Sequence, residues 1–99
     1  MAIQKLDEDE LKNELGKLKG GWSLEQGKLH REYKFRDFIE AFGFMSRVAL
    51  AAESLGHHPE WSNVWNRVMI DLSTHSIGGL SKLDFELATK IRELAGTQG

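Results

Sequence analysis

The feature that most constrains this fold is a long apolar segment in the middle of the chain. Residues 36–55 contain no proline and do not alternate between apolar and polar types. On a helical wheel their apolar side chains cover an arc of roughly 180°. These side chains are Phe38, Ala41, Phe42, Phe44, Met45, Val48, Ala49, Ala51, Ala52 and Leu55. The segment predicts a helix over 36–55, which Gly56 ends and Pro59 keeps from resuming.

This predicted helix has more apolar surface than one contact with a sheet requires. A helix that covers one face of a sheet usually needs an apolar stripe of about 100°. On a monomer, the rest of the arc would leave Phe, Met, Val and Leu side chains together in water. We therefore expect the helix to pack against copies of itself.

Alternating residues on both sides of this helix predict two β-hairpins. The first has strands within 22–26 and 28–35 around a turn at Gly27, with Trp22 and Leu24 on one side of its first strand. The second lies within 60–74 and turns near Asn66. The side chains that should share a face are Leu29, Arg31, Tyr33 and Phe35 in the first hairpin, and Val68, Ile70 and Leu72 in the second.

Two further helices are predicted near the ends of the chain. Residues 8–18 follow a capping-box pattern, in which Asp7 stands three residues before Glu10. After a Gly-Gly pair, Ser81 and Asp84 have the same spacing, and leucines and an isoleucine follow at helical intervals. Both segments therefore predict capped amphipathic helices.

The order of these elements, α-β-β-α-β-β-α, predicts an α+β fold. We expect a single domain over residues 1–99, with the helices packed on one face of a four-stranded antiparallel sheet. A chain of 99 residues is long enough to build one hydrophobic core without a disulfide or a structural metal.

Charge and composition exclude several classes of function. Thirteen Lys and Arg residues against 15 Asp and Glu give a net charge of −2, which disfavours direct binding to nucleic acid. The chain has no cysteine, so thiolate nucleophiles and thiolate zinc sites are excluded. No segment approaches the ~20 apolar residues of a membrane helix, and the N-terminus has no signal-peptide pattern. We therefore predict a cytoplasmic protein.

Two adjacent histidines before Pro59 are the first candidates for chemistry. His58 precedes the proline and should be extended, so the side chains of His57 and His58 should point to opposite sides. That divergence fits metal chelation poorly and fits general acid-base work better. His75 lies in the loop 73–79, which is rich in glycine and small hydroxyl residues. On these grounds alone, an ordinary hydrogen-bonded role for each histidine stays open.

The wider pattern resembles the pterin-4a-carbinolamine dehydratase family, also known as dimerization cofactors of a hepatic homeodomain transcription factor. In that family an acidic residue stands four positions before His-His-Pro, an aromatic residue follows, and a Thr-His pair and a helical Asp come later. The matching residues are Glu53, His57, His58, Pro59, Trp61, Thr74, His75 and Asp84. The resemblance covers essentially the whole chain. It departs at Gly56, where many animal members have a polar residue such as Asp.

The resemblance implies a dehydratase without metal or cofactor that converts 4a-hydroxytetrahydrobiopterin to quinonoid dihydrobiopterin and water. Such an enzyme recycles the cofactor of aromatic amino acid hydroxylases. By analogy, His57 and His75 are the acid-base pair, and His58 completes the catalytic set chiefly by binding substrate. The other residues expected at the substrate are Gly56, Ser73, Thr74 and Ser76, supported by Glu53 and Asp84.

The same resemblance implies a second function, as a protein-binding coactivator. Animal relatives dock through the long helix onto the dimerization segment of a homeodomain activator. We expect a homotetramer, a dimer of dimers joined through the helix around Phe38–Leu55. A homeodomain transcription factor and an aromatic amino acid hydroxylase are the candidate partners, and the first would add the nucleus as a location. The intact catalytic histidines favour the enzyme.

Overall fold

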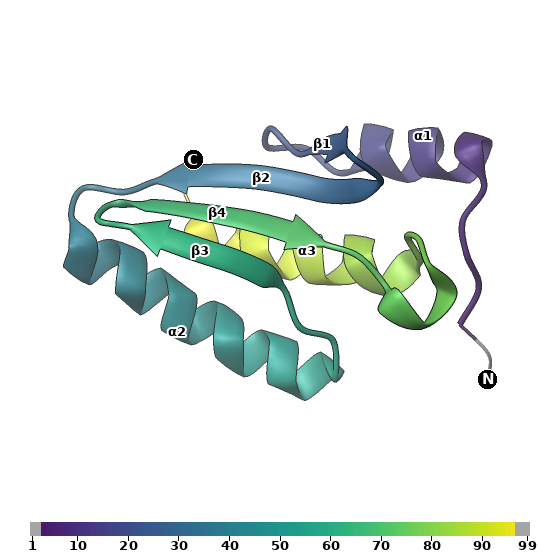
Figure 1. Ribbon diagram of the computed structural model, residues 1–99. Helices are drawn as coiled ribbons and strands as arrows, with labels where there is room; N and C mark the ends of the chain where they lie inside the picture. The colour runs from purple at the N-terminus through teal and green to yellow at the C-terminus, as the bar shows by residue number, and fades with distance from the viewer. Residues whose placement is uncertain (1–2, 97–99) are drawn as a thin grey trace.

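The two predicted hairpins form one four-stranded antiparallel sheet in the computed structural model, which describes residues 3–96. The strands are β1 (Ser23–Glu25), β2 (Lys28–Lys34), β3 (Glu60–Val64) and β4 (Arg67–Leu72). Their order is β1-β2-β4-β3, so the hairpins join through β2 and β4 (Figure 1). In this register Leu29 lies opposite Leu72, and Tyr33 lies opposite Val68. The apolar side chains of both central strands therefore share one face.

The helices are α1 (Glu8–Lys17), α2 (Phe38–Leu55) and α3 (Lys82–Ala95). Helices α2 and α3 lie side by side on one face of the sheet, and α1 lies near β1 (Figure 1). The capping boxes at Asp7 and Ser81 are both formed, as the spacing predicts. The α+β architecture and the order of its elements are thus confirmed. Of the helices between residues 3 and 96, none is both long and apolar enough to cross a membrane.

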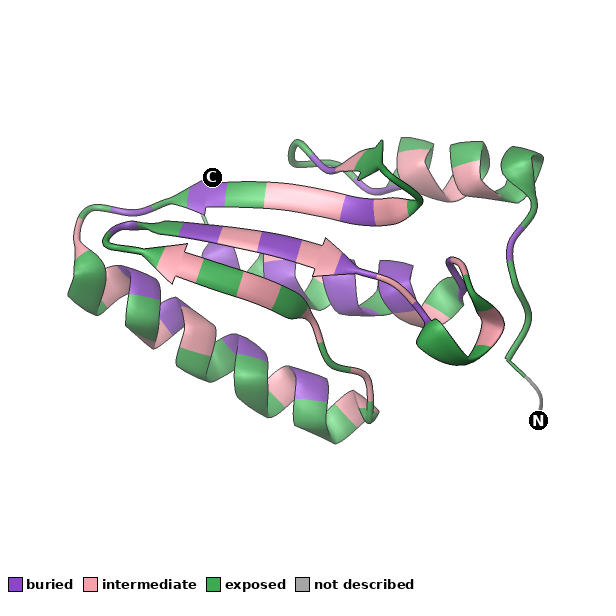
Figure 2. Cartoon of the chain, in the orientation of Figure 1, coloured by how far each residue is buried: buried purple, intermediate pink, exposed green. Residues whose placement is uncertain are grey.

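The core fills the space between the sheet and the helices, where buried residues recur along β2, β4, α2 and α3 (Figure 2). An aromatic cluster occupies one end of it. The ring of Phe44 on α2 lies 4.7 Å from that of Phe35 and 5.2 Å from that of Tyr33, between centroids. Contacts at these distances stabilise the packing of α2 on the sheet.

The predicted apolar arc of α2 is divided between the core and the surface. The buried residues are Ala41, Phe44, Val48 and Ala52, while Phe38 and Phe42 stack on each other at the surface. Ile39 is 81% exposed and Leu50 is 75% exposed, so apolar surface continues outside the predicted arc. The prediction that this helix has more apolar surface than its contact with the sheet covers is therefore confirmed for the isolated chain.

Three local details differ from the sequence prediction. The long helix begins at Phe38 rather than at residue 36, because the side chain of Asp37 caps it by accepting a hydrogen bond from the Glu40 amide. Leu24 lies opposite Leu29 but is exposed, since β1 is a short strand at the edge of the sheet. The predicted loop after β4 contains a short 3-10 helix, His75–Ile77.

Candidate active site

The predicted site residues meet at one end of the sheet. His57 and His58 follow the C-terminus of α2, and His75 begins the 3-10 helix after β4. With the start of α3, these segments surround a cavity of about 460 Å³. It is lined by Ile3, Gly56, His57, His58, Pro59, Glu60, Ser73, Thr74, His75, Ser76 and Leu83. Every residue predicted to contact substrate therefore lines one cavity.

His57 is nearly buried and is held by Asp84 from the first turn of α3. Only 11% of the His57 side chain and none of the Asp84 side chain is exposed to solvent. The Nε2 atom of His57 lies 2.6 Å from Oδ1 of Asp84, which is a short hydrogen bond. Gly56 ends α2 in the left-handed conformation, with φ of 65°, and so redirects the chain just before His57.

Asp84 is itself fixed by two further hydrogen bonds. Its Oδ2 atom accepts one from the Thr74 hydroxyl at 2.8 Å and one from the backbone amide of Ser81 at 2.9 Å. The Thr74 and Ser81 hydroxyl oxygens also lie 2.8 Å apart. An ionised carboxylate only accepts hydrogen bonds, so we assign the shared hydrogen to Nε2 of His57. In that tautomer Nδ1 of His57 is the nitrogen able to accept a proton.

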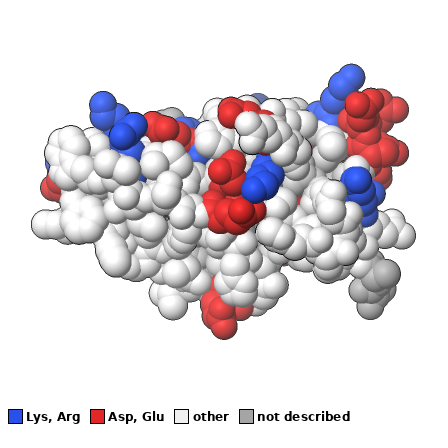
Figure 3. Space-filling view, viewed as in Figure 1, with Lys and Arg blue, Asp and Glu red and all other residues white. Residues whose placement is uncertain are grey.

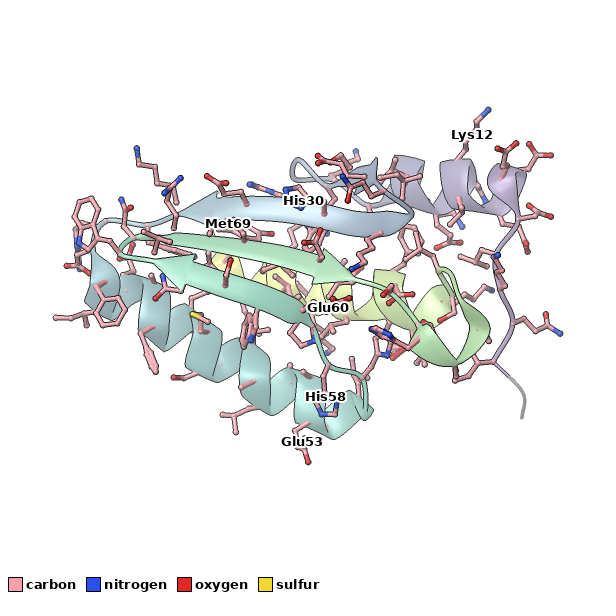
Figure 4. All side chains as sticks on the ribbon, viewed as in Figure 1. Lys12, His30, Glu53, His58, Glu60 and Met69 are labelled. Carbon is pink, nitrogen blue, oxygen red and sulfur yellow. The ribbon has the colours of Figure 1, made fainter. Side chains whose placement is uncertain are left out.

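His58 faces away from Asp84 and contacts Glu53 instead. Its Nε2 atom lies 2.8 Å from Oε1 of Glu53, and both side chains are largely exposed (Figure 4). Adjacent histidines therefore have different partners, as the extended geometry before Pro59 predicts. Of the two adjacent imidazoles, Glu53 therefore contacts that of His58.

His75 is the most exposed of the three imidazoles and contacts Glu60, at the start of β3. The distance from His75 Nε2 to Oε1 of Glu60 is 3.4 Å, and 78% of the His75 side chain is exposed. The Nζ atom of Lys28 lies 3.1 Å from each oxygen of the same carboxylate. The hydrogen bond from Lys28 holds the pKa of Glu60 below its usual value.

Sequence reasoning missed Glu60 and the apolar walls formed by Ile3 and Leu83. The signal for Glu60 is its register: once the turn near Asn66 is known, Glu60 lies opposite Asp71, at the sheet end from which His75 follows.

His30, the remaining histidine of the chain, also contacts an acidic side chain. Its Nδ1 atom lies 2.8 Å from Oδ1 of Asp71 on β4, and 26% of its side chain is exposed. His30 pairs with Asp71 because the two residues are direct neighbours across the strands, on the sheet face opposite the helices (Figure 4). It does not line the cavity of the other histidines.

Between residues 3 and 96, no group of three or more His, Asp or Glu side chains is arranged to hold a metal ion. The prediction that catalysis requires no metal stays a prediction. A larger cavity of about 620 Å³ lies between the N-terminal segment and the start of α3, and no histidine lines it. Three of the four histidines of the chain thus line the smaller cavity.

Comparison with known proteins identifies the family of the chain. The model of the family described as pterin 4 alpha carbinolamine dehydratase matches residues 4–94. A candidate pterin-4-alpha-carbinolamine dehydratase of Solibacter usitatus is 55% identical over 92% of this chain and 95% of its own length. A similar candidate from a Chelativorans species is 53% identical over 96% of this chain and 98% of its own.

A solved structure supports the same assignment. The crystal structure of a transcriptional coactivator/pterin dehydratase from Brucella melitensis has a TM-score of 0.89 and 45% sequence identity, over 94% of this chain and all of that one. The chain thus shares the α+β fold of this solved relative, with three histidines lining one cavity. The chain belongs to the pterin-4a-carbinolamine dehydratase family.

Proposed function

We propose that this enzyme converts 4a-hydroxytetrahydrobiopterin to quinonoid dihydrobiopterin and water by histidine acid-base catalysis. In this role, a single domain over residues 1–99 would recycle the pterin cofactor of aromatic amino acid hydroxylases. The observation that carries the proposal is that His57, held by a buried carboxylate, lines the same cavity as His75. Membership of the family supplies the substrate class.

The reaction needs two proton transfers and no redox step. The 4a-hydroxyl group leaves as water once a proton reaches its oxygen, and the C–O bond breaks with both electrons going to oxygen. A ring N–H proton is removed, and its electron pair forms the new C=N bond of the quinonoid ring. One group must therefore give a proton and another must take one.

His57 and His75 are the groups that we propose for these transfers. Asp84 fixes the ring of His57 and stabilises the imidazolium that forms when Nδ1 takes a proton. His75 enters the cavity from a different element, so the two imidazoles approach a bound ligand from separate segments of the chain. Imidazole is the side chain that most often serves as a general acid or base in enzymes.

The remaining cavity residues are proposed to bind the pterin. His58 is exposed beside Glu53 and can donate to a ring heteroatom, and Ser73 and Ser76 offer hydroxyl and backbone groups. The Thr74 hydroxyl already donates to Asp84, so its proposed contribution is to hold the carboxylate behind His57. Gly56 has no side chain to offer, and any contact there would come from the backbone.

Turnover of a synthetic pterin carbinolamine tests the proposal. We expect His57→Ala and His75→Ala each to lower kcat about 10²- to 10⁴-fold, which is the usual contribution of one acid-base group. His30→Ala is the matched control, because this histidine also pairs with an aspartate but lies outside the cavity. Folded variants that all turn over at the wild-type rate would contradict the proposal.

Helix α2 supports a further proposal, that the enzyme is a homotetramer joined through this helix. Its surface exposes Phe38, Ile39, Phe42 and Leu50, and the viewed face has little charge along most of the helix (Figure 3). Burial of such a patch would stabilise an assembly of identical chains. Sedimentation at micromolar concentration should give one species near four times 11.2 kDa, and a clean monomer would contradict it.

The same surface is the observation that favours the alternative function, a coactivator that stabilises dimers of a homeodomain transcription factor. The Brucella relative carries both descriptions, coactivator and dehydratase. A partner of this kind would compete with self-association for the exposed face of α2. Loss of tetramers on titration with a homeodomain dimerization segment would support the alternative, and unchanged tetramers would count against it.

A further inference from the structure

Glu60 connects three segments that are distant in sequence. It begins β3, and its carboxylate contacts Lys28 at the start of β2 and both Ser73 and His75 after β4. The distances from Oε1 of Glu60 are 3.1 Å to Lys28 Nζ, 3.5 Å to Ser73 Oγ and 3.4 Å to His75 Nε2. Glu60 also lines the cavity that holds the three histidines.

The side chain of His75 is much less constrained by burial than that of His57. The ring of His57 is 11% exposed and packed in place, whereas that of His75 is 78% exposed. Within residues 3–96, the only charged or hydrogen-bonding partner of the His75 side chain is Glu60. An exposed imidazole without that contact would exchange freely among rotamers, and correct placement of a reacting group contributes strongly to rate.

We propose that Glu60 is a positioning residue, which holds the imidazole of His75 at the cavity through their 3.4 Å contact. Lys28, at the start of β2, anchors the carboxylate. The inference rests on the proposed function, in that it assigns the acid-base role to His75. Neither the family pattern of the sequence nor the predicted supporting residues include Glu60. Glu60 would orient the exposed imidazole of His75, as Asp84 orients the buried imidazole of His57.

The position of Lys28 explains how the half-exposed carboxylate of Glu60 can hold the His75 imidazole in place. The ammonium group lies within 3.1 Å of both carboxylate oxygens, so Glu60 is held from the β2 side and its charge is retained at neutral pH. The alternative is an ordinary surface ion pair, which typically contributes little to stability or function. The two interpretations differ in what they predict for kcat.

The test compares Glu60→Gln with Glu32→Gln in the assembled enzyme. Glu32 is a matched control because it also pairs with a cation from a neighbouring strand, Arg67 at 4.0 Å, and has a similar exposure, 46% against 45%. Glu32 does not line the cavity. We expect Glu60→Gln to lower kcat about 10-fold, which is less than the loss expected when the His75 imidazole itself is removed. KM should change less than about 2-fold. The control should leave both constants unchanged.

A double-variant cycle separates positioning from a merely structural role. In a His75→Ala background, Glu60→Gln should have almost no further effect on kcat, because the ring that it positions is gone. Full additivity of the two losses would overturn the proposal. So would a Glu60→Gln variant with the wild-type kcat, provided that thermal unfolding shows both proteins to be folded.

A readout without substrate distinguishes this inference from the proposed function. Side-chain relaxation of ¹³C-labelled histidine should show a more mobile His75 ring in Glu60→Gln and an unchanged ring in Glu32→Gln. If the wild type proves inactive on pterin carbinolamine, the proposed function fails. The relaxation measurement still shows whether Glu60 restrains the His75 ring. An equally ordered His75 ring in Glu60→Gln overturns the proposal in either case.

Discussion

Replacement of Asp84 by asparagine probes the link between the fold and the chemistry of His57. Oδ2 of Asp84 accepts from the Thr74 hydroxyl and the Ser81 amide, so the oxygen of an asparagine must take that position. Its NH₂ group would then face Nε2 of His57, 2.6 Å away in the native site. Two donors cannot face each other, and the imidazole would have to move its hydrogen to Nδ1.

The expected loss of activity follows from this forced change of the His57 tautomer. Nδ1 would no longer accept a proton, and no negative charge would stabilise the imidazolium. We expect kcat to fall about 10²- to 10⁴-fold. The free energy of unfolding should change by only about 1–2 kcal/mol, because the amide keeps both bonds of the native Oδ2.

Asp84→Ala should behave differently, because it removes all three hydrogen bonds at once. Each orphaned buried group costs about 1–3 kcal/mol, so the total approaches a large part of the 5–15 kcal/mol that stabilises a typical domain. We expect much of this variant to be unfolded or to melt early. The asparagine variant is therefore the informative one.

The assay is steady-state turnover combined with ¹⁵N spectra of the imidazole, which report the tautomer. Asp71→Asn is the matched control, since Asp71 pairs with His30 at 2.8 Å outside the cavity. It should leave kcat unchanged. A folded Asp84→Asn enzyme with the wild-type kcat, or with His57 still protonated at Nε2, would refute this reasoning.

Four further outcomes are expected. Lys28→Met should raise the pKa of Glu60 toward the ordinary carboxyl value, as measured by ¹³C titration, because the hydrogen bond that lowers it is lost. His58→Ala should raise KM more than it lowers kcat in steady-state kinetics. Phe44 is fully buried, so Phe44→Ala should lower the free energy of unfolding by about 3–5 kcal/mol in denaturant titrations. Phe42 is half exposed, so Phe42→Ala should chiefly weaken self-association, measured by sedimentation.

The contribution of Glu60 to stability should change with pH in a definite direction. Its folded pKa lies below the ordinary value, so its ion pairs stabilise the native state above the unfolded pKa and are lost as pH falls through the folded one. Stability measured between neutral and acidic pH should therefore decline less steeply in Glu60→Gln than in the wild type. An identical decline would contradict the contact with Lys28.

The elements of the fold were predictable from the sequence because their signals are local. The apolar period of α2, the alternation in β4 and the capping boxes at Asp7 and Ser81 each depend on residues only a few positions apart. Local rules state which residues can form an element. They also placed His57 and His58 on diverging sides, since that follows from the extended chain before Pro59.

The partners of the site residues were less predictable, because they depend on how distant segments meet. Spacing alone assigns Asp84 to the cap of α3, and its bond to His57 requires the end of α2 to reach that cap. Contact between Glu60 and His75 requires the register of β3 on β4 and the path of the following loop. The pairing of His30 with Asp71 was missed for the same reason.

Turnover of a pterin 4a-carbinolamine by the purified chain tests the central claim most directly. The wild type should release water and quinonoid dihydropterin well above the spontaneous rate. The His57→Ala, His75→Ala double variant, folded and with its assembly intact, should fall to nearly that rate. A wild type that leaves the spontaneous rate unchanged, or a double variant that keeps full activity, would contradict histidine acid-base catalysis at this cavity.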